Sequence, residues 1–339
     1  MKVLVVGAKK APAIESYFVR HLNTLGAETR HFAAQNIFFD HYERNIVSKI
    51  LFKAGLSPIY RKINRLFLEE VKDFRPDIVW VFKGMEIFPE SLVKVKEMGI
   101  RLVNYNTDNP FLFSGKGSGN ANVVRSLDLY DLHLSYDPGI RKRIIEETGI
   151  RCELLPFSFE EDPALYERCV TQQEDPRICF VGSPDKDRTA FLEKIADEVP
   201  LVVYGPGWDT FTRHPQITIY PAVHKDDYWK TLYRFRAQLN LMRPHNPDSH
   251  NMRSFEVPGI GGIMLAPDTA DHRRYFEDGK EIFLYAGAED CIAKARSLLQ
   301  MTPPQARTIR TAARSRSMEL GYSYMGRTTQ VYKWFQELT

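Results

Sequence analysis

Short apolar runs alternate with segments whose apolar residues recur at helical spacing along nearly the whole chain. Strands are predicted at 2–6, 28–33, 77–82, 101–106, 131–136, 177–182, 201–205, 217–221 and 237–242. Helices are predicted between them, as over 58–74, where Ile59, Ile63, Phe67 and Val71 share one face. Asp137 and Pro138 suit the N-cap and first turn of another helix. This alternation is typical of parallel sheets covered on both faces and therefore predicts an α/β protein.

The alternation lapses over 157–176, where the composition is acidic and flanked by prolines, so we predict a linker there. A chain of 339 residues also exceeds the usual size of one core. We expect two Rossmann-like lobes facing across a cleft, with boundaries at 1–165 and 166–318. Residues 319–339 form a final helix with an aromatic stripe, which is predicted to cross back to the N-terminal lobe.

Composition excludes several classes of protein. A net charge of +3 is too small for a dedicated nucleic-acid binder, so we expect no nucleic-acid partner. Four cysteines without CxxC spacing favour a reducing cytosol. No apolar run reaches the roughly 18 residues of a membrane span. We therefore expect a cytoplasmic protein.

One segment leaves two interpretations open. Residues 46–67 mix large apolar side chains with the basic residues Lys49, Lys53, Arg61, Lys62 and Arg65. Such a segment can rest peripherally on an anionic membrane at its inner face. A helix that packs its apolar face on the sheet and exposes its charges explains the same pattern.

Ligands of open parallel sheets bind at the carboxyl ends of the strands. The residues at or just past the ends of the predicted strands include Lys83, Asp108, Gly182 with Ser183, Gly205 and Arg243. The first turn, "VVGAKKAPAIES", lacks the glycines of GxGxxG, which argues against a dinucleotide-dependent oxidoreductase. His245 and His250 flank Asp248, but this spacing is a weak metal signal, and we expect solvated loop histidines and no metal.

The stretch "NMRSFEVPGIGGIML" (251–265) places Glu256 in a short predicted helix before a glycine-rich turn and a buried strand. A carboxylate there can accept hydrogen bonds from the vicinal hydroxyls of a nucleotide ribose. The alternative is that Glu256 caps the helix or pairs with Arg253. Gly259, Gly261 and Gly262 would let the backbone turn tightly and approach a ligand or a neighbouring strand.

The region "MRSFEVPGIGGIMLAPDTADHRRYFEDGKEIFLYAGAEDCIAKARSLL" resembles the C-terminal signature of CgeB-like glycosyltransferases, which are related to the retaining group-1 glycosyltransferases. "PDIVWVFKG" and "RLVNYNTDNP" resemble N-terminal elements of the same family. The resemblance implies a GT-B fold and a bacterial, cytoplasmic enzyme without required metal or cofactor. It also implies a nucleotide-sugar donor on the C-terminal lobe and an acceptor on the N-terminal lobe.

The chemistry of such a transfer suggests roles for particular residues. The leaving diphosphate is expected to be stabilised by Arg253, Arg188, Arg243 and a helix N-terminus near 252–256, and Glu256 is expected to anchor the ribose. Asp108 orients or deprotonates the acceptor hydroxyl, unless it only makes an Asx turn before Pro110. Lys83 contacts acceptor or phosphate. The remaining residues expected around the donor are Gly182, Ser183, Arg188, Gly205, Arg243, Asp248 and Gly261.

The sequence thus predicts a metal-independent glycosyltransferase of the hexosyltransferase type. It would move a sugar from a nucleoside diphosphate to a glycan, cell-surface or metabolite acceptor, with retention inherited from the resemblance. Two alternatives remain: a nucleotide-sugar epimerase on the same fold, and a catalytically silent sugar-nucleotide-binding or coat-assembly protein.

Overall fold

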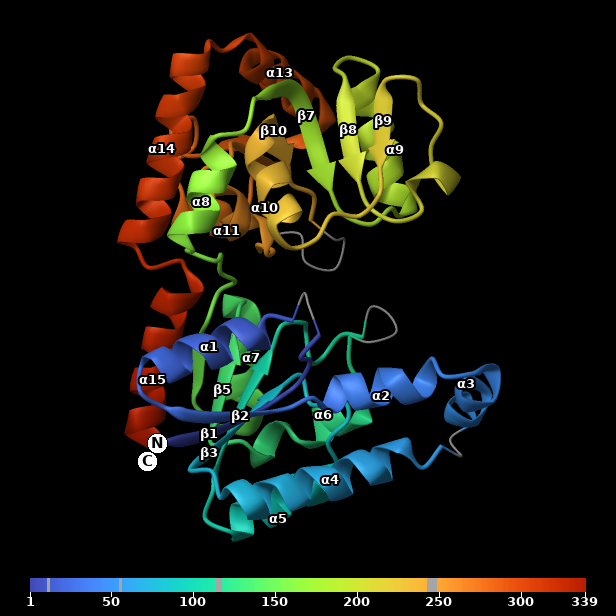
Figure 1. Ribbon diagram of the computed structural model, residues 1–339, viewed down its shortest axis with the longest axis vertical. Coiled ribbons are helices and arrows are strands. Elements are labelled where there is room, and N and C mark those ends of the chain that lie inside the picture. The colour runs from blue at the N-terminus through green and yellow to red at the C-terminus, as the bar shows by residue number, and fades with distance from the viewer. Residues whose placement is uncertain (11–12, 55–56, 114–117, 243–248) are drawn as a thin grey trace. The chain divides into compact units, whose positions relative to one another are not determined.

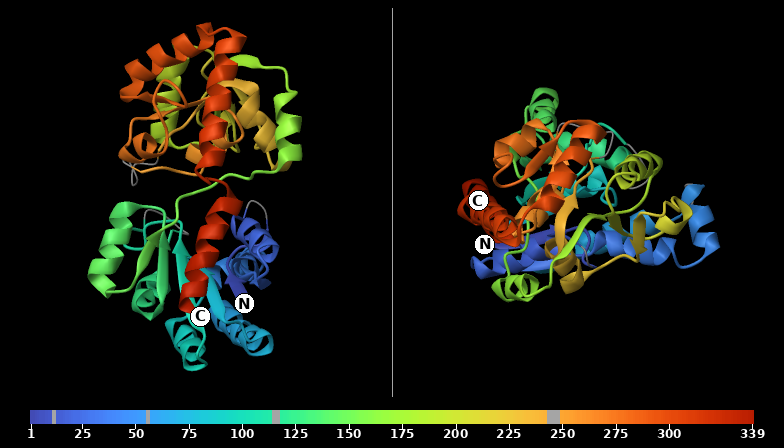
Figure 2. Two further views of the ribbon diagram at one scale, coloured as in Figure 1. Left: turned by 90° about the vertical axis from the view of Figure 1, so that its left-hand side faces the viewer. Right: turned by 90° about the horizontal axis from the view of Figure 1, so that it is seen from above.

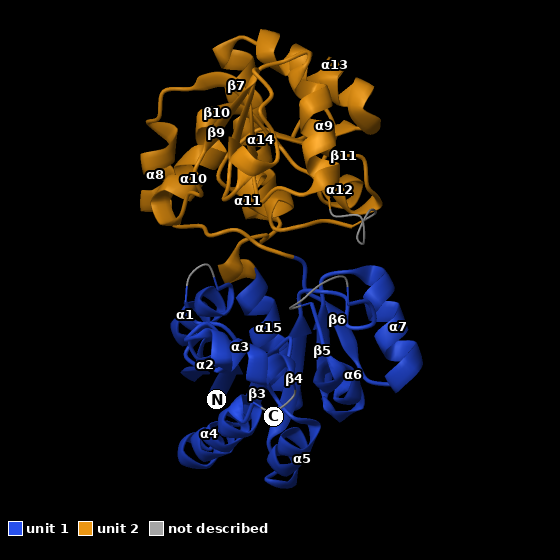
Figure 3. Cartoon of the chain, turned by 90° about the vertical axis from the view of Figure 1, so that its right-hand side faces the viewer, with its two compact units in different colours: residues 1–156, 327–339 blue, residues 157–326 orange. Residues whose placement is uncertain are grey.

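The computed structural model describes residues 1–10, 13–54, 57–113, 118–242 and 249–339. The chain forms two compact units (Figure 3). Unit 1 comprises residues 1–156 and 327–339, and unit 2 comprises residues 157–326. Each unit contains one six-stranded sheet in which the paired strands are parallel.

The sheet of unit 1 has the strand order β2-β1-β3-β4-β5-β6 (Figure 1). Its strands are β1 (Lys2–Val6), β2 (Glu28–Phe32), β3 (Ile78–Phe82), β4 (Arg101–Asn106), β5 (Leu132–Ser135) and β6 (Cys152–Leu154). The helices between them are α1 (Glu15–Thr24), α2 (Ala34–Tyr42), α3 (Ile46–Lys53), α4 (Ile59–Phe74), α5 (Pro89–Glu97), α6 (Ala121–Arg125) and α7 (Pro138–Thr148), with a 3-10 turn at Leu127–Leu129. Asp137 caps α7 through the Ile140 N–H, which confirms the predicted start of that helix.

Strand β3 shows how this sheet is buried on both faces. Its five residues are all buried, and consecutive side chains point to opposite faces. Val79 and Val81 belong to the core that includes α4 and α5. Trp80 instead packs against Phe18 of α1, with ring centroids 5.0 Å apart. A continuous apolar strand is therefore what a doubly covered parallel sheet requires.

The last helix, α15 (Tyr324–Leu338), packs on the sheet of unit 1. The rings of Phe335 and Trp80 meet edge-to-face with centroids 5.3 Å apart. Arg101 donates to the Leu338 carbonyl at 3.1 Å. The two chain ends consequently lie next to each other in unit 1 (Figure 2).

The sheet of unit 2 has the order β12-β11-β10-β7-β8-β9. Its strands are β7 (Asp175–Val181), β8 (Leu201–Tyr204), β9 (Ile217–Tyr220), β10 (Phe235–Leu239), β11 (Met264–Pro267) and β12 (Phe283–Tyr285). Its helices are α8 (Pro163–Val170), α9 (Lys186–Ala196), α10 (Lys225–Arg234), α11 (Arg253–Gly259), α12 (Ala270–Tyr275), α13 (Gly287–Gln300) and α14 (Pro303–Glu319), with a 3-10 turn at Trp208–Thr210. The predicted α/β class with two Rossmann-like lobes is confirmed.

The prediction of an irregular linker over 157–176 is wrong. This stretch contains α8, capped by Asp162, and β7 begins at Asp175. Phe159, Leu165 and Cys169 are buried in the core of unit 2. Asp162 and Pro163 are the cap and first helical residue of α8, where both residue types are favoured, and Asp175 and Pro176 belong to β7.

The strand orders fix where each sheet can bind a ligand. In unit 1 the order reverses between β1 and β3, and in unit 2 it reverses between β7 and β10. Ligands of such sheets bind outside the carboxyl ends of the strands at this reversal. Lys83 directly follows β3, Gly182 directly follows β7, and Asn240 directly follows β10.

Candidate functional site

Glu256 lies on α11, a short helix that the chain enters from the carboxyl end of β10. Its side chain is buried, with 5% of its surface exposed. The Arg253 guanidinium donates to Glu256 Oε2 at 2.6 Å, and the Tyr228 hydroxyl donates to the same oxygen at 2.5 Å. The guanidinium also lies over the Tyr228 ring, 4.6 Å from its centroid. The ion pair with Arg253, one of the two interpretations of Glu256, is therefore present.

Both of these hydrogen bonds reach one oxygen of the carboxylate. Among the residues that the structure describes, no hydrogen bond to Glu256 Oε1 is found. Within the same described set, the buried Nε of Arg253 has no hydrogen-bond partner. The pair thus combines a fixed carboxylate and a fixed cation, and Glu256 Oε1 is the atom of the pair that can still accept a hydrogen bond from a ligand.

The turn after α11 needs its glycines for conformation and close packing. Gly261 has φ +80°, in the left-handed region that side chains disfavour. A Cβ on Gly262 would lie 2.6 Å from the Leu232 carbonyl oxygen, and one on Gly259 would lie 2.2 Å from the Phe159 ring. The expected tight turn is confirmed, but the close neighbours are helix α10 and the Phe159 ring, and not the neighbouring strand that was expected.

A buried polar network holds the start of α11. The Ser254 hydroxyl donates to His272 Nε2 at 2.8 Å, because His272 Nδ1 lies 2.8 Å from the Pro267 carbonyl and must carry the proton. Asn240 Nδ2 donates to Ser254 Oγ at 3.2 Å, and Asn251 Nδ2 donates to Asn240 Oδ1 at 2.7 Å. Burial lowers the pKa of His272 to about 4, which keeps the ring neutral. The network ties α11 to the ends of β10 and β11.

His250 corrects a second expectation. It is fully buried, and its Nδ1 lies 2.7 Å from Asp271 Oδ2. The Phe157 N–H donates to its other ring nitrogen at 3.4 Å. The prediction of a solvated loop histidine is thus wrong for His250. His245 lies outside the described residues. Arg243 and Asp248, expected near the donor, also lie outside them.

Three of the predicted donor residues lie after β7: Gly182 and Ser183 in the β7–α9 turn and Arg188 in the first turn of α9. Arg188 Nη1 donates to the Ser183 carbonyl at 3.1 Å, and its Nε lies 3.5 Å from Asp185. Gly182 accepts from Trp208 Nε1 at 2.8 Å. Arg188 therefore braces its own turn in this structure.

Close packing explains why a glycine, Gly205, follows the end of β8. A Cβ there would lie 2.2 Å from the Gly182 carbonyl oxygen. The turns after β7 and β8 can approach this closely only without a side chain. Gly205 brings the two strand ends together at the edge where ligands bind.

The residues also bear on metal binding. The chain contains an Asp-x-Asp motif at Asp185-Lys186-Asp187. In metal-dependent transferases such a motif can coordinate a metal ion. Here Asp185 Oδ1 caps α9 by accepting from the Arg188 N–H at 2.9 Å. Across the described part of the chain, no group of three or more His, Cys, Asp or Glu side chains is arranged to hold a metal.

In unit 1, Lys83 and Asp108 form an ion pair between the ends of β3 and β4. Lys83 Nζ lies 2.5 Å from Asp108 Oδ2, and both side chains remain about one-quarter to one-third exposed, at 26% and 32%. Lys83 has φ +57°, an uncommon conformation for a lysine. Asn106 and Asn109 make the Asx turns here, by accepting from the N–H groups of Asp108 and Phe111. The Asp108 carboxylate is directed to Lys83.

Two buried carboxyl groups, Glu15 and Glu86, interact electrostatically with Lys83 of this ion pair. Glu15 accepts from the Ala8 N–H at 2.9 Å and is 7% exposed. Burial raises the pKa of Glu15, and it raises the pKa of Glu86 to about 7. The positive charge of Lys83 opposes both shifts. Buried carboxyl groups with raised pKa values are candidates for proton transfer.

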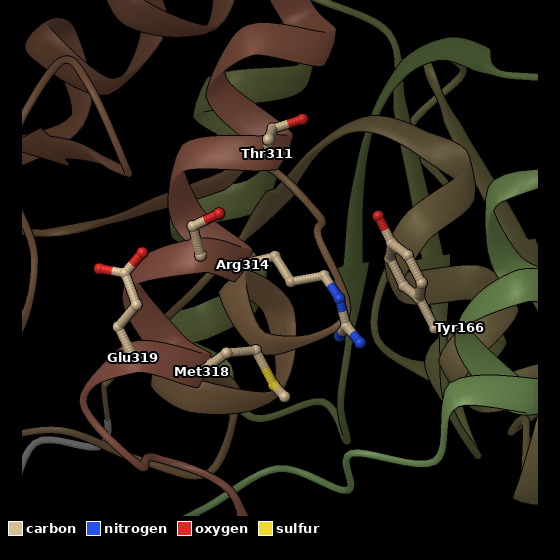
Figure 4. A pocket seen from close by; sticks show the side chains of 6 residues that line it. Tyr166, Thr311, Arg314, Met318 and Glu319 are labelled. Atoms are coloured by element: carbon tan, nitrogen blue, oxygen red, sulfur yellow. The ribbon is translucent and has the colours of Figure 1, made fainter.

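A surface pocket of about 330 Å³ lies elsewhere in unit 2, between α8 and α14 (Figure 4). It is lined by Tyr166, Thr311, Arg314, Ser315, Met318 and Glu319. Arg314 lies over the Tyr166 ring at 3.7 Å and donates to the Gly259 carbonyl at 2.5 Å. A cation at the C-terminal end of α11 suits that end of the helix, so Arg314 has a structural role.

Sequence reasoning missed Tyr228, Glu15, Glu86 and the His272 network. Tyr228 sits in "KDDYWKTLYRFR", where nothing separates it from the other aromatic residues of α10. Glu15 and Glu86 follow strand ends by three or more residues, so the rule of inspecting residues directly after a strand passes over them. Only the fold brings these side chains to their partners.

The comparisons with known proteins agree with this architecture. Residues 188–333 match the model of a family described as glycosyl transferase-like. A comparison with curated protein sequences finds no match. In the described parts of the chain, no helix combines the length and apolar character needed to cross a membrane.

Solved structures resemble nearly the whole chain. Sucrose-phosphate synthase from Thermosynechococcus elongatus is 10% identical with a TM-score of 0.68, covering 100% of this chain and 99% of that one. Anabaena HepE, solved in complex with UDP-glucose, is 13% identical with a TM-score of 0.63, and the match covers 99% of this chain and 100% of HepE. A putative UDP-N-acetylglucosamine 2-epimerase from Listeria monocytogenes is 14% identical with a TM-score of 0.59, and the match covers 99% of this chain and 97% of that one. The chain thus has the GT-B fold, as predicted.

Proposed function

We propose that this protein is a glycosyltransferase that moves a sugar from a nucleoside diphosphate donor to a hydroxyl group of an acceptor. The glycosyl transferase-like segment covers residues 188–333, which include α11 and most of unit 2. HepE, a structure of the same fold, was solved with UDP-glucose. Unit 2 would accordingly bind the donor, and unit 1 would bind the acceptor.

The proposal rests on the arrangement of Arg253, Glu256 and Tyr228. Arg253 and Tyr228 fix the carboxylate through Oε2, and they leave Oε1 without a hydrogen bond from any residue described. Vicinal ribose hydroxyls are suitable donors to such an oxygen, because hydrogen bonds to a charged acceptor are strong. Glu256 would therefore anchor the ribose.

Arg253 would stabilise the diphosphate as it leaves. In the reaction, the bond between the anomeric carbon and the β-phosphate oxygen breaks, and a bond to the acceptor oxygen forms. Negative charge develops on the leaving diphosphate, and a fixed cation lowers the energy of that transition state. Helix α11 is only seven residues long, so we assign this role to the guanidinium and not to the helix dipole. Arg188 and Arg243 are the further cations proposed for the diphosphate.

Unit 1 would supply the proton acceptor. Asp108 would orient or deprotonate the acceptor hydroxyl, and Lys83 would contact acceptor or phosphate. The assignment is supported by the ion pair, which places the Asp108 carboxylate and the Lys83 ammonium together at the ends of β3 and β4, where ligands of such a sheet bind.

Finer features of the proposal come from the resemblance to CgeB-like enzymes. They are transfer of a hexose, retention at the anomeric carbon and turnover without a divalent metal or cofactor. Activity that persists in EDTA is the expected result for the last of these. Activity that disappears in EDTA and returns with manganese or magnesium would contradict it, and Asp185-Lys186-Asp187 would then be the first residues to substitute.

An epimerase is the second candidate, because the Listeria structure with the same fold is a putative UDP-N-acetylglucosamine 2-epimerase. A silent sugar-nucleotide-binding protein is the third. A thermal-shift screen of nucleotide sugars identifies a donor, since a ligand bound only to the native state raises the melting temperature. Product analysis then separates the candidates. Free sugar and nucleoside diphosphate without acceptor indicate a transferase, an isomerised nucleotide sugar indicates an epimerase, and an unchanged donor indicates a binding protein.

A further inference from the structure

Helix α3 exposes an apolar face on unit 1. Its exposed aliphatic residues are Ile46 (74%), Val47 (62%), Ile50 (59%) and Leu51 (38%). In a helix each residue advances by about 100°, so these four positions share one continuous arc of the surface. Large aliphatic side chains exposed side by side, unlike single scattered ones, mark an interaction surface.

The rest of α3 explains why this face cannot turn inward. Ser48 is buried, and its N–H is capped by Asn45 at 2.8 Å. Phe52 packs against Phe38 of α2 and Tyr60 of α4, with ring centroids 4.9 and 5.5 Å apart. These contacts fix the rotation of α3 and direct the arc of Ile46, Val47, Ile50 and Leu51, hereafter the α3 apolar face, away from unit 1.

Basic residues border the α3 apolar face. Lys49 and Lys53 lie on the next part of the helix surface, and Arg44 precedes α3 at an exposed position. The basic residues Arg61 and Lys62 are exposed in the first turn of α4, which follows. Among the described residues, no ion pair is found for these five side chains. The region therefore combines exposed apolar side chains with basic residues, alongside the exposed carboxylate of Glu43, which precedes Arg44.

We propose that α3 docks unit 1 on an anionic lipid bilayer, with the α3 apolar face inserted at the headgroup boundary and the basic residues facing acidic headgroups. This combination is typical of interfacial helices, where buried apolar area and attraction to anionic lipid act together. The two interpretations that the sequence left open for residues 46–67 then apply to different helices. Helix α4 buries Ile59, Ile63 and Phe67 in the core, and α3 carries the membrane surface.

A second copy of the chain fits this surface less well than a lipid. In a twofold dimer the same patch lies on both partners, so the lysines of α3 would approach each other. The exposed apolar area of four aliphatic side chains is a few hundred Å². A stable dimer buries about 800 Å² per partner. A bilayer needs no such area, and its negative headgroups complement the charge.

Vesicle co-sedimentation of the full chain tests the proposal. We expect binding to phosphatidylcholine vesicles that contain phosphatidylglycerol, no binding to phosphatidylcholine alone, and weaker binding as salt increases. Ile46→Ser with Ile50→Ser should weaken binding at least tenfold, because two inserted side chains become polar. The matched control is Met318→Ser with Leu320→Ser, which changes two exposed apolar residues of unit 2 and should leave binding unchanged.

Equal sedimentation of the α3 variant and wild type would overturn the proposal, as would binding that ignores lipid charge. Analytical ultracentrifugation tests the alternative that a second copy of the chain binds the α3 apolar face. A dimer that dissociates in the α3 variant, together with no binding to either vesicle, would assign the face to a second copy and refute lipid docking. Nucleotide binding by the α3 variant should equal that of wild type, so this test and that of the proposed function fail separately.

Discussion

The Tyr228 hydroxyl lies 2.5 Å from Glu256 Oε2. This contact joins α10 to α11 and directs the carboxylate of a helix that the chain enters at the carboxyl end of β10. Arg253 binds the same oxygen. A buried carboxylate with two donors on one oxygen keeps a single orientation, which a binding site for vicinal hydroxyls requires.

Tyr228→Phe should reduce both stability and donor affinity. The substitution removes a hydrogen bond to a buried charged group, which costs about 1.5–3 kcal/mol of unfolding free energy. Urea unfolding measures the stability, and calorimetry measures the nucleotide affinity. Tyr233→Phe on the same helix is the control, because the Arg310 guanidinium stacks on that ring and the ring remains. Equal stability of the Tyr228→Phe protein and wild type would show that the contact does not hold the carboxylate.

Arg253→Lys should lower turnover more than donor affinity. Lysine keeps the charge but loses the planar fork that bonds Glu256 and that would also contact the diphosphate in the proposed reaction. Removing one group that stabilises developing charge typically costs about 10²–10³ in kcat. Arg188→Lys is the comparison, and a much smaller loss is expected because Arg188 donates to the Ser183 carbonyl and forms an ion pair with Asp185. Similar losses in both variants would mean that the diphosphate is held at the β7–α9 turn.

Phe335→Ala should destabilise unit 1. Phe335 is fully buried and packs on Trp80, and truncation of a core phenylalanine costs about 3–5 kcal/mol. Gln336→Ala, at an exposed position of the same helix, should change stability by less than about 0.5 kcal/mol. Urea unfolding of both proteins measures the difference. A small effect of Phe335→Ala would mean that α15 contributes little to the fold of unit 1.

Acid should destabilise the protein between about pH 6.5 and pH 4. Burial lowers the pKa of His31, His133 and His272 to about 4 from the ordinary value of 6.5. In this window the unfolded chain binds protons that the folded chain does not, so stability is lost as pH falls. The raised pKa of Glu86, about 7, acts oppositely, because the folded state binds its proton first and loses stability as pH rises from 4.5.

Burial also raises the pKa of Glu15, so two carboxyl groups oppose three histidines, and the net stability should still fall as pH falls through this window. Each net proton contributes about 1.4 kcal/mol per pH unit. Glu86→Gln should make the acid loss steeper, because it removes one opposing group. Urea unfolding at a series of pH values gives the slopes. A wild-type stability that rises on acidification from pH 6.5 would show that these histidines are not held neutral.

The sequence predicted the elements whose signals are local. The run "RLVNYN" became β4 at its predicted bounds, and Asp137 capped α7, because apolar periodicity and capping depend on neighbouring residues only. Helix α8 was missed because its cap and proline also suit a linker. His250 was misjudged because burial against Asp271 depends on packing between α11 and α12. Tyr228 was missed for the same reason, since its partner lies 28 positions away.

Calorimetric titration of UDP and UDP-glucose into wild type and Glu256→Ala tests the central claim most directly. If Glu256 anchors the ribose, the variant should lose about 1.5–3 kcal/mol of binding free energy, the usual range for hydrogen bonds to a charged group. That loss corresponds to an affinity roughly 10- to 150-fold weaker. A folded Glu256→Ala protein that binds the nucleotide as tightly as wild type would contradict the assignment of α11 as the donor site.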